Sequence, residues 1–156
     1  VTPTDTSGWL TRMTAHFDAV ALRPTGGFYF IPAARAAEWR KLVAAVDTAT
    51  TYTVFEIPAM STRDAVDAVL AAIVREAQQT ASNISADIKS GKLGGRALRS
   101  RARMADAAAE KVERYEACLD KSLDELREQL AQLSATSVKA ALTADAEKEA
   151  TRAGGE

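Results

Sequence analysis

The sequence predicts an α+β fold, in which a small three-stranded sheet with covering helices, in the order α-β-β-α-β, precedes a long antiparallel, coiled-coil-like helical hairpin. Two stretches of apolar residues at three- and four-residue intervals, and three short runs rich in β-branched and aromatic residues, indicate the α/β part. A heptad-like apolar repeat interrupted by glycines indicates the hairpin. We therefore expect an α/β subdomain at 1–60, a helical hairpin at 61–134 with a glycine-rich tip at 90–95, and a helical extension or disordered tail at 135–156.

The first helix is expected over residues 7–20, because one of its faces is apolar. Two short strands, at 19–23 and 28–32, follow on either side of a Pro/Gly turn. Gly26 and Gly27 supply the positive φ angles that a β-hairpin turn requires. The N-terminal region therefore begins with a helix that leads into a β-hairpin.

A second amphipathic helix is expected over residues 33–46, where Trp39 and Val46 belong to an apolar row at helical spacing. The third strand is expected over residues 51–57, which are rich in β-branched and aromatic residues. Pro58 ends this strand because proline cannot donate to a β-ladder. A three-stranded sheet with one covered face is only marginally stable alone, so this sheet should depend on the helices that follow.

The helical hairpin begins at Ser61, where a helix is expected to run to about Ser90 before the glycine-rich turn. A second helix begins near Gly95, and two helices of about thirty residues, each roughly 45 Å long, must then fold back on each other. Ser122 and Glu125 have the spacing of a capping box, so the second helix either continues through this point or breaks and restarts. Its apolar row at seven-residue intervals consists of Leu98, Ala105, Val112, Leu119, Leu126 and Leu133.

Composition argues against an enzyme or a metalloprotein. The 156 residues include 20 Lys and Arg against 21 Asp and Glu, a formal net charge of −1, so the overall charge predicts neither a nucleic-acid binder nor an enzyme for acidic substrates. His16 is the only histidine and Cys118 the only cysteine, which excludes a His-rich metal site and an intramolecular disulfide. No catalytic signature is visible, so we expect a protein that is not an enzyme and that uses no metal and no cofactor.

A cytoplasmic protein without a membrane span is expected. No stretch approaches the roughly 18 consecutive apolar residues of a transmembrane helix, and the first residues lack the basic-then-apolar pattern of a secretory signal. A single cysteine suits a reducing compartment. Because the chain opens on Val1, we also expect it to be trimmed or to be a fragment.

Charge is distributed unevenly along the hairpin. Residues 89–104 contain six basic and no acidic residues, whereas residues 105–156 contain 12 acidic and 7 basic residues. A positive tip on a negative shaft favours an oriented contact with phosphate, with an acidic protein surface or with another copy's shaft. The plainer interpretation is a solvated loop whose charges only keep the chain soluble. The candidate residues for contact with nucleic acid or another anion are Lys89, Lys92, Arg96, Arg99, Arg101 and Arg103.

Four motifs occur in a fixed order along the chain: Gly-Gly-Phe-Tyr-Phe-Ile-Pro at 26–32, Gly-Lys-Leu-Gly-Gly-Arg-Ala-Leu at 91–98, Val-Glu-Arg-Tyr-Glu at 112–116 and Ser-Leu-Asp-Glu-Leu at 122–126. Together they resemble an uncharacterised family in bacteria and bacteriophages, over about residues 10–134. The resemblance implies a Gly-Gly-aromatic strand followed by a long helical hairpin. It also implies a bacterial cytoplasmic location, or the host cytoplasm for a phage protein, and no established activity. Family members have glycine just before the serine, where this chain has Asp-Lys.

The leading functional hypothesis is a non-enzymatic structural or adaptor protein that self-associates or docks a protein partner through its helical hairpin. A projecting amphipathic helix pair has more apolar surface than its own contacts cover. The alternative hypothesis is a nucleic-acid-binding module that uses the basic tip, although the tip lacks interleaved aromatic residues for base stacking. The residues expected at the protein interface are Leu119, Leu126, Leu130 and Leu133.

Overall fold

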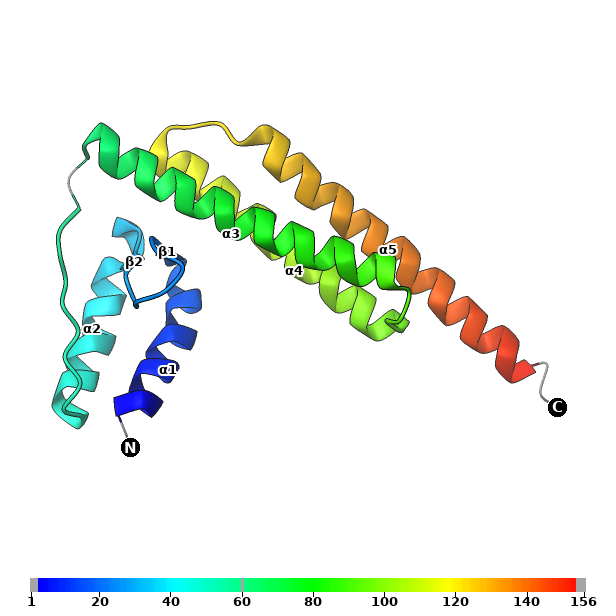
Figure 1. The fold of residues 1–156 in the computed structure, drawn as a ribbon, viewed down its shortest axis with the longest axis horizontal. Coiled ribbons are helices and arrows are strands. Elements are labelled where there is room, and N and C mark those ends of the chain that lie inside the picture. The colour runs from blue at the N-terminus through cyan, green and yellow to red at the C-terminus, as the bar shows by residue number, and fades with distance from the viewer. Residues whose placement is uncertain (1–2, 60, 154–156) are drawn as a thin grey trace. The chain divides into compact units, whose positions relative to one another are not determined.

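The computed structural model describes residues 3–59 and 61–153. These residues form five α-helices, one 3-10 helix and two strands (Figure 1): α1 Pro3–Thr14, η1 Ala15–Phe17, β1 Val20–Ala21, β2 Tyr29–Phe30, α2 Ala33–Ala49, α3 Arg63–Ser90, α4 Gly95–Leu119 and α5 Asp124–Ala153. The chain divides into two compact units, Val1–Ala72 (the N-terminal unit) and Ile73–Glu156 (the helical unit). Helix α3 spans the boundary between them.

The predicted three-stranded sheet is wrong, because the described residues contain a two-stranded sheet and are otherwise mainly helical. Strands β1 and β2 pair antiparallel, with Val20 opposite Phe30. The turn between them has the expected positive φ angles, 101° at Gly26 and 63° at Gly27. Residues 51–57 join no sheet despite their composition. Each strand of the hairpin is only two residues long and offers too few ladder hydrogen bonds to recruit a third strand.

The first helix is shorter than predicted and begins earlier. Helix α1 ends at Thr14 and passes into η1, after which Asp18 adopts a left-handed φ of 54° that turns the chain towards β1. Phe17 and Val20 are nevertheless both buried. The apolar spacing over 7–20 therefore arises from a shared core and not from one continuous helix.

The core of the N-terminal unit is closed by α2, which was predicted over 33–46 and extends to Ala49. The rings of Phe17 and Trp39 meet edge to face, with centroids 5.2 Å apart. The Arg35 guanidinium lies 5.6 Å from the centroid of the Phe17 ring and donates a 3.0 Å hydrogen bond to the main-chain carbonyl of residue 16. These contacts fix α2 against the corner between η1 and β1.

The chain breaks between α4 and α5, which is one of the two alternatives that the spacing of Ser122 and Glu125 left open. Asp120 adopts a φ of 51°, and the N–H groups of Asp120 and Lys121 both donate to the Glu116 carbonyl. This arrangement is a left-handed helix C-cap. The Ser122 hydroxyl then donates to the Asp124 carboxylate at 2.6 Å, at the first residue of α5. Among the described residues, the region after 61 therefore consists of three long helices, α3, α4 and α5.

The helical unit packs α4 antiparallel to both of its neighbours. An ion pair between Lys111 Nζ and Glu76 Oε1, at 2.6 Å, joins α4 to α3, and one between Arg127 Nη1 and Glu116 Oε2, at 3.3 Å, joins α5 to α4. Figure 1 shows α5 continuing past the turn between α3 and α4. The buried side chains between the helices include Ile73, Ala77, Ala81, Ile84, Leu98, Ala102, Ala105, Val112, Tyr115, Leu126, Leu130 and Ala141.

The region expected to be a helical extension or a disordered tail continues α5 without interruption from residue 135 to Ala153. The remaining residues of that segment, 154–156, lie outside the described part of the chain. Small buried residues, among them Ser134, Ser137 and Ala141, line the side of α5 that faces the core. Ser137 is completely buried, and its hydroxyl donates to the Leu133 carbonyl at 2.8 Å, so its polar atom is satisfied within the helix.

Candidate functional site at the basic tip

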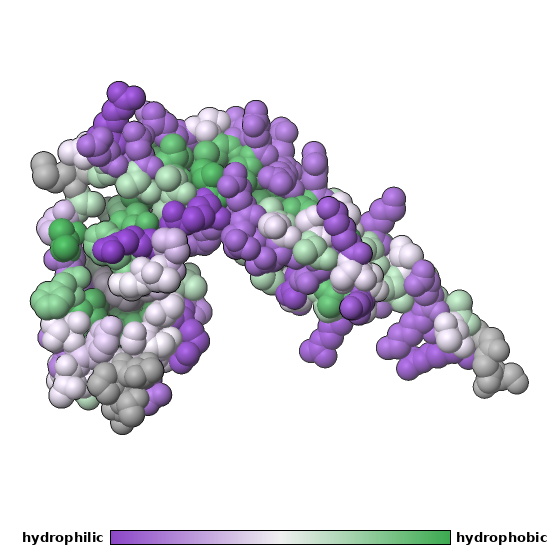
Figure 2. Space-filling view, in the orientation of Figure 1, coloured by the Kyte–Doolittle hydropathy of each residue, from purple (hydrophilic) through white to green (hydrophobic). Residues whose placement is uncertain are grey.

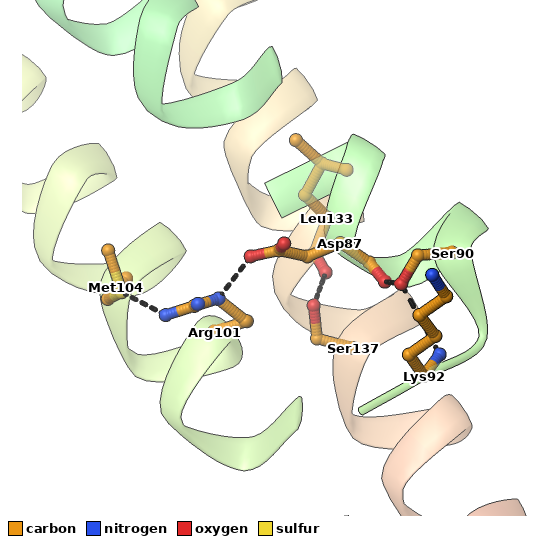
Figure 3. Close-up of polar contacts among 7 residues, drawn as sticks. All are labelled: Asp87, Ser90, Lys92, Arg101, Met104, Leu133 and Ser137. Atoms are coloured by element: carbon orange, nitrogen blue, oxygen red, sulfur yellow. Dashed lines mark hydrogen bonds and ion pairs between the residues drawn. The ribbon is translucent and has the colours of Figure 1, made fainter. Parts of the chain in front are cut away.

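The basic tip consists of the turn between α3 and α4 and the two helix ends beside it. Gly91 ends α3 with a φ of 62°, the left-handed conformation that glycine tolerates, and its N–H donates to the Ile88 carbonyl at 3.2 Å. The Ser90 hydroxyl donates to the main-chain carbonyl of Asp87 at 2.7 Å and accepts a 3.3 Å hydrogen bond from the N–H of Lys92 (Figure 3). These bonds fix the backbone of the turn.

Arg101 is one of two predicted contact residues whose charge is compensated within the chain. Its Nε lies 2.6 Å from the Asp87 carboxylate on α3, and its Nη1 lies 3.4 Å from the Met104 sulfur, as Figure 3 shows. Both charged side chains are about one-third exposed. Arg101 therefore joins α4 to α3, and its guanidinium is not available as an isolated cation.

Arg99 is the second compensated residue. Its Nη1 lies 2.6 Å from the Asp145 carboxylate on α5. The same carboxylate fills the space beside Gly95, since a Cβ built on that glycine would lie 2.1 Å from Asp145 Oδ1. Asp145 thus lies against the first turn of α4, where the helix dipole favours a negative charge. Sequence spacing gave no indication of this contact, because Asp145 lies in the region assigned to an extension or tail.

The other four predicted contact residues remain exposed cations. None of them forms an ion pair with a described residue. Arg96 and Arg103 are seven residues apart, which puts them on one face of α4. The sequence predicted six equivalent cations. Two of them are paired with carboxylates, which leaves four. The four uncompensated cations are Lys89, Lys92, Arg96 and Arg103.

The four leucines expected at a protein interface fall into two classes. Leu126 and Leu130 are buried, at 9% and 0% exposure, so they form part of the chain's own core. Leu119 and Leu133 are partly exposed. Leu133 borders a surface groove of about 580 Å³ between α3 and α5. The lining of this groove is largely polar and consists of Gln78, Ala81, Ser82, Ser85, Ala86, Lys89, Gln129, Gln132, Leu133 and Thr136.

Sequence reasoning did not identify the outer face of α5. Val138 and Leu142 are 43% and 65% exposed there, and the exposed Ala131, Ala135 and Ala146 continue their row at three- and four-residue intervals. Figure 2 shows this unit mostly covered by hydrophilic side chains, with apolar areas between them. Helix α4 has one clearly apolar side, whereas α5 does not. This difference was the signal in the sequence that could have indicated the exposed apolar row.

His16 and Cys118 are the single histidine and the single cysteine of the sequence, and they belong to different units. His16 is exposed in η1 of the N-terminal unit, and Cys118 is an exposed free thiol on α4 of the helical unit. Within residues 3–59 and 61–153, no group of three or more His, Cys, Asp or Glu side chains is arranged to hold a metal ion. Over the same residues, no helix combines the length and the apolar character needed to cross a membrane.

Comparison with known proteins identifies a family. No curated protein and no solved structure matches this chain. A family model matches residues 1–148, and therefore both units, and it is described as a family of unknown function, DUF6744. The match agrees with the resemblance of the sequence motifs to a family without an assigned activity. The chain therefore belongs to DUF6744, a family of unknown function.

Proposed function

We propose that this chain is a non-enzymatic structural or adaptor protein that docks a protein partner, another copy of itself or a different protein, through its helical unit. The observation that carries the proposal is the apolar row on the outer face of α5, in which Leu142 is 65% and Val138 43% exposed. Ala135 and Ala131 lie one and two turns before Val138 on the same face. A docked partner removes this row from water, which is favourable at roughly 25 cal/mol per Å² of apolar surface.

Helix α5 is apolar on two adjacent sides. One side contains Leu126, Leu130 and Ala141 and is buried in the unit's own core. The second side, which contains Val138 and Leu142, is displaced from the first by one residue along the sequence. A helix that is apolar beyond the side facing its own core exposes apolar surface that a docked partner can cover. The exposed positions of α4 are mostly charged, so α5 is the better candidate for docking.

The interface proposed here differs from the leucine row expected from the heptad pattern. It keeps Leu119 and Leu133, which are partly exposed, and adds Val138 and Leu142. It omits Leu126 and Leu130 because their side chains are already covered within the chain.

Light scattering coupled to size-exclusion chromatography tests self-association over a range of protein concentrations. The double variant Val138→Glu/Leu142→Glu introduces two charges into the apolar row, and we expect it to shift the assembly towards monomer. Thr143→Glu is the matched control, since Thr143 is exposed on the same helix and its hydroxyl donates to the carbonyl of Lys139. The control should retain the wild-type mass.

Docking of a different protein requires a second measurement. A photoreactive amino acid at position 142 should form a defined crosslink in the producing cell, and the crosslink should disappear when Val138→Glu is added. A wild-type chain that is monomeric at every concentration and forms no crosslink from this position contradicts both forms of the proposal.

Nucleic-acid binding at the basic tip is the second candidate function. It is favoured by the four exposed cations, Lys89, Lys92, Arg96 and Arg103, which have no carboxylate partner among the described residues. Each phosphate contact made by such a cation contributes to affinity by releasing counterions, so binding of this kind weakens steeply with salt. Four contacts are few, which makes weak, salt-sensitive binding the expected form.

A matched pair of variants tests this candidate by fluorescence anisotropy with labelled DNA and RNA at low salt. Replacing Lys92 and Arg96 by Ala removes two uncompensated cations and should weaken binding and reduce its salt dependence. Replacing Arg99 and Arg101 by Ala removes the same formal charge from residues that are already paired with carboxylates, so it should have the smaller effect. Equal effects of the two variants, or no binding by the wild type, exclude the candidate.

The proposal includes a bacterial or bacteriophage origin and a cytoplasmic location. It is supported by the order of the Gly-Gly-aromatic and helical motifs and by Cys118, an exposed thiol without a disulfide partner. Sequencing of the genes that flank the coding region tests the origin, since phage structural genes beside it would support the phage form.

A further inference from the structure

The segment between α2 and α3 is extended but belongs to no sheet. Figure 1 shows it running back alongside α2 within the N-terminal unit. Its side chains alternate in exposure: Tyr52 and Val54 are partly buried, whereas Thr53 and Phe55 are exposed. This period of two is that of a β-strand with one side against its own protein. The strand predicted over 51–57 thus has strand-like alternation without a partner strand.

Two local contacts hold the segment in place. At its start, the Thr50 hydroxyl donates to the Val46 carbonyl at 2.9 Å and accepts a 3.1 Å hydrogen bond from the N–H of Tyr52. Near its end, Arg40 Nε lies 2.9 Å from both carboxylate oxygens of Glu56. The Arg40 guanidinium also donates to this carboxylate from Nη2, and these hydrogen bonds raise the pKa of Arg40 and lower the pKa of Glu56 from its ordinary value of 4.5. These contacts therefore hold both ends of the segment within the N-terminal unit.

The backbone between these two contacts has no hydrogen-bond partner among the described residues. Over the described residues, no N–H or C=O group of 53–57 forms a hydrogen bond. The side chains that flank these groups are among the most exposed large apolar residues of the chain, with Phe55 at 85% and Ile57 at 72%. Alternating backbone donors and acceptors beside exposed apolar side chains match the edge of another extended strand.

We propose that residues 53–57 pair antiparallel with the same residues of a second copy of the chain, forming an intermolecular two-stranded ribbon. Glu56 is the only charged residue of the segment, and its carboxylate is already bound to Arg40. Two copies can therefore approach without the like-charge repulsion that natural edge strands use to prevent pairing. The segment also has high β-propensity, low charge and no proline before Pro58, which is the composition of self-pairing strands.

The alternation of the segment suits a symmetric register. In an antiparallel pair, residues that lie opposite each other point to the same face. A register centred on Phe55 puts the two Phe55 rings opposite each other and each Thr53 opposite an Ile57. All of these side chains lie on the exposed side of the segment, so the pairing covers exposed apolar surface and leaves Tyr52 and Val54 against their own unit. This surface lies in the N-terminal unit, so the inference does not depend on the function proposed for α5.

Two measurements on the full chain test the pairing. Light scattering should show a concentration-dependent dimer, and hydrogen–deuterium exchange should show protection of the amides of 53–57 that increases with protein concentration.

Phe55→Asp should weaken dimerisation by about tenfold or more, since it replaces an apolar cross-strand pair by two like charges. Thr53→Pro, which removes one strand N–H, should act in the same direction. Phe28→Asp is the control, because Phe28 is an exposed aromatic residue of the same unit that lies outside the segment.

Circular dichroism should show that the helical content of each variant is unchanged, since Phe55 and Thr53 are both exposed. A chain that remains monomeric while the amides of 53–57 exchange freely overturns the proposal and leaves a strand from another protein as the occupant. A dimer that survives both Phe55→Asp and Thr53→Pro also overturns it. If that dimer is instead lost in Val138→Glu/Leu142→Glu, the function proposed for α5 stands without the strand pairing.

Discussion

Arg99 and Asp145 are 46 residues apart in the sequence and form an ion pair with a nitrogen–oxygen distance of 2.6 Å, which joins the first turns of α4 to the outer part of α5. The same carboxylate occupies the space next to Gly95. The ion pair leaves Arg99 unavailable to a ligand at the basic tip. The position of the carboxylate also requires a residue without a side chain at position 95.

Gly95→Ala should reveal this coupling in a double-mutant cycle with Asp145→Ala. Replacing glycine at a helix start normally stabilises a protein by about 0.4–1 kcal/mol through the unfolded chain. In the wild type the added Cβ would meet the Asp145 carboxylate, so we expect the gain to be lost. In the Asp145→Ala background the gain should return.

Urea denaturation of the four proteins of this cycle gives the coupling energy, which we expect to be about 0.5 kcal/mol or more. Additive effects of the two substitutions would contradict the close approach. Arg99→Ala alone should cost no more than about 1 kcal/mol, because both partners of the ion pair are partly exposed.

The division between buried and exposed leucines predicts stability effects of very different size within α5. Leu130→Ala should lower the free energy of unfolding by about 2–5 kcal/mol, since its side chain is completely buried. Leu142→Ala makes the same chemical change at a side chain that is 65% exposed, and its effect should stay within about 0.5 kcal/mol. Thermal or urea denaturation at a fixed, low protein concentration separates the two outcomes. Equal losses would mean that Leu142 is covered, as in a stable assembly.

The heptad pattern could predict the core of the helical unit but not its connectivity. Leu98, Val112 and Leu126 are buried as a seven-residue row requires, yet the row crosses the boundary between α4 and α5. Apolar spacing reports only which side chains face a shared core, so it is the same whether the helix continues or turns. The break is determined by the backbone hydrogen bonds from Asp120 and Lys121 to Glu116 and by the side-chain hydrogen bond from Ser122 to Asp124, of which the sequence indicated only the Ser-x-x-Glu spacing.

Asp120→Gly should stabilise the break between α4 and α5. A left-handed conformation costs an L-residue roughly 1–2 kcal/mol and glycine almost nothing, although glycine also gains entropy in the unfolded chain. We therefore expect a net gain of about 0.5–1 kcal/mol from this substitution at φ 51°. Asp120→Val is the comparison, and it should lose stability because a β-branched residue is strained there. Asp120 is exposed, so neither change alters the core. A lower melting temperature for Asp120→Gly than for the wild type would be inconsistent with the left-handed cap.

The candidate site shows a similar limit of sequence reasoning. The cluster of basic residues in 89–104 was visible from the sequence, because residues close in sequence around a turn are close in space. The carboxylates that neutralise Arg99 and Arg101 were not, since Asp87 and Asp145 come from two other helices. Strand propensity at 51–57 likewise indicated an extended backbone but could not indicate whether this chain provides the partner strand.

The ion pair between Arg40 and Glu56 predicts a pH dependence for the segment after α2. Hydrogen bonding from Arg40 lowers the pKa of Glu56 below 4.5, so the folded state favours the ionised carboxylate. The stabilisation is therefore fully present above pH 4.5 and is lost as the pH falls through the lowered pKa of the folded protein. Below that pH the carboxyl is protonated, Arg40 loses its acceptor, and residues 53–57 should detach more readily from α2.

The resonance of Arg40 Nε–H should report this change by NMR, with a midpoint below pH 4.5. Glu56→Gln, which keeps the shape of the side chain and cannot ionise, should abolish the titration. A midpoint at or above 4.5 in the wild type would mean that the pair does not form in solution.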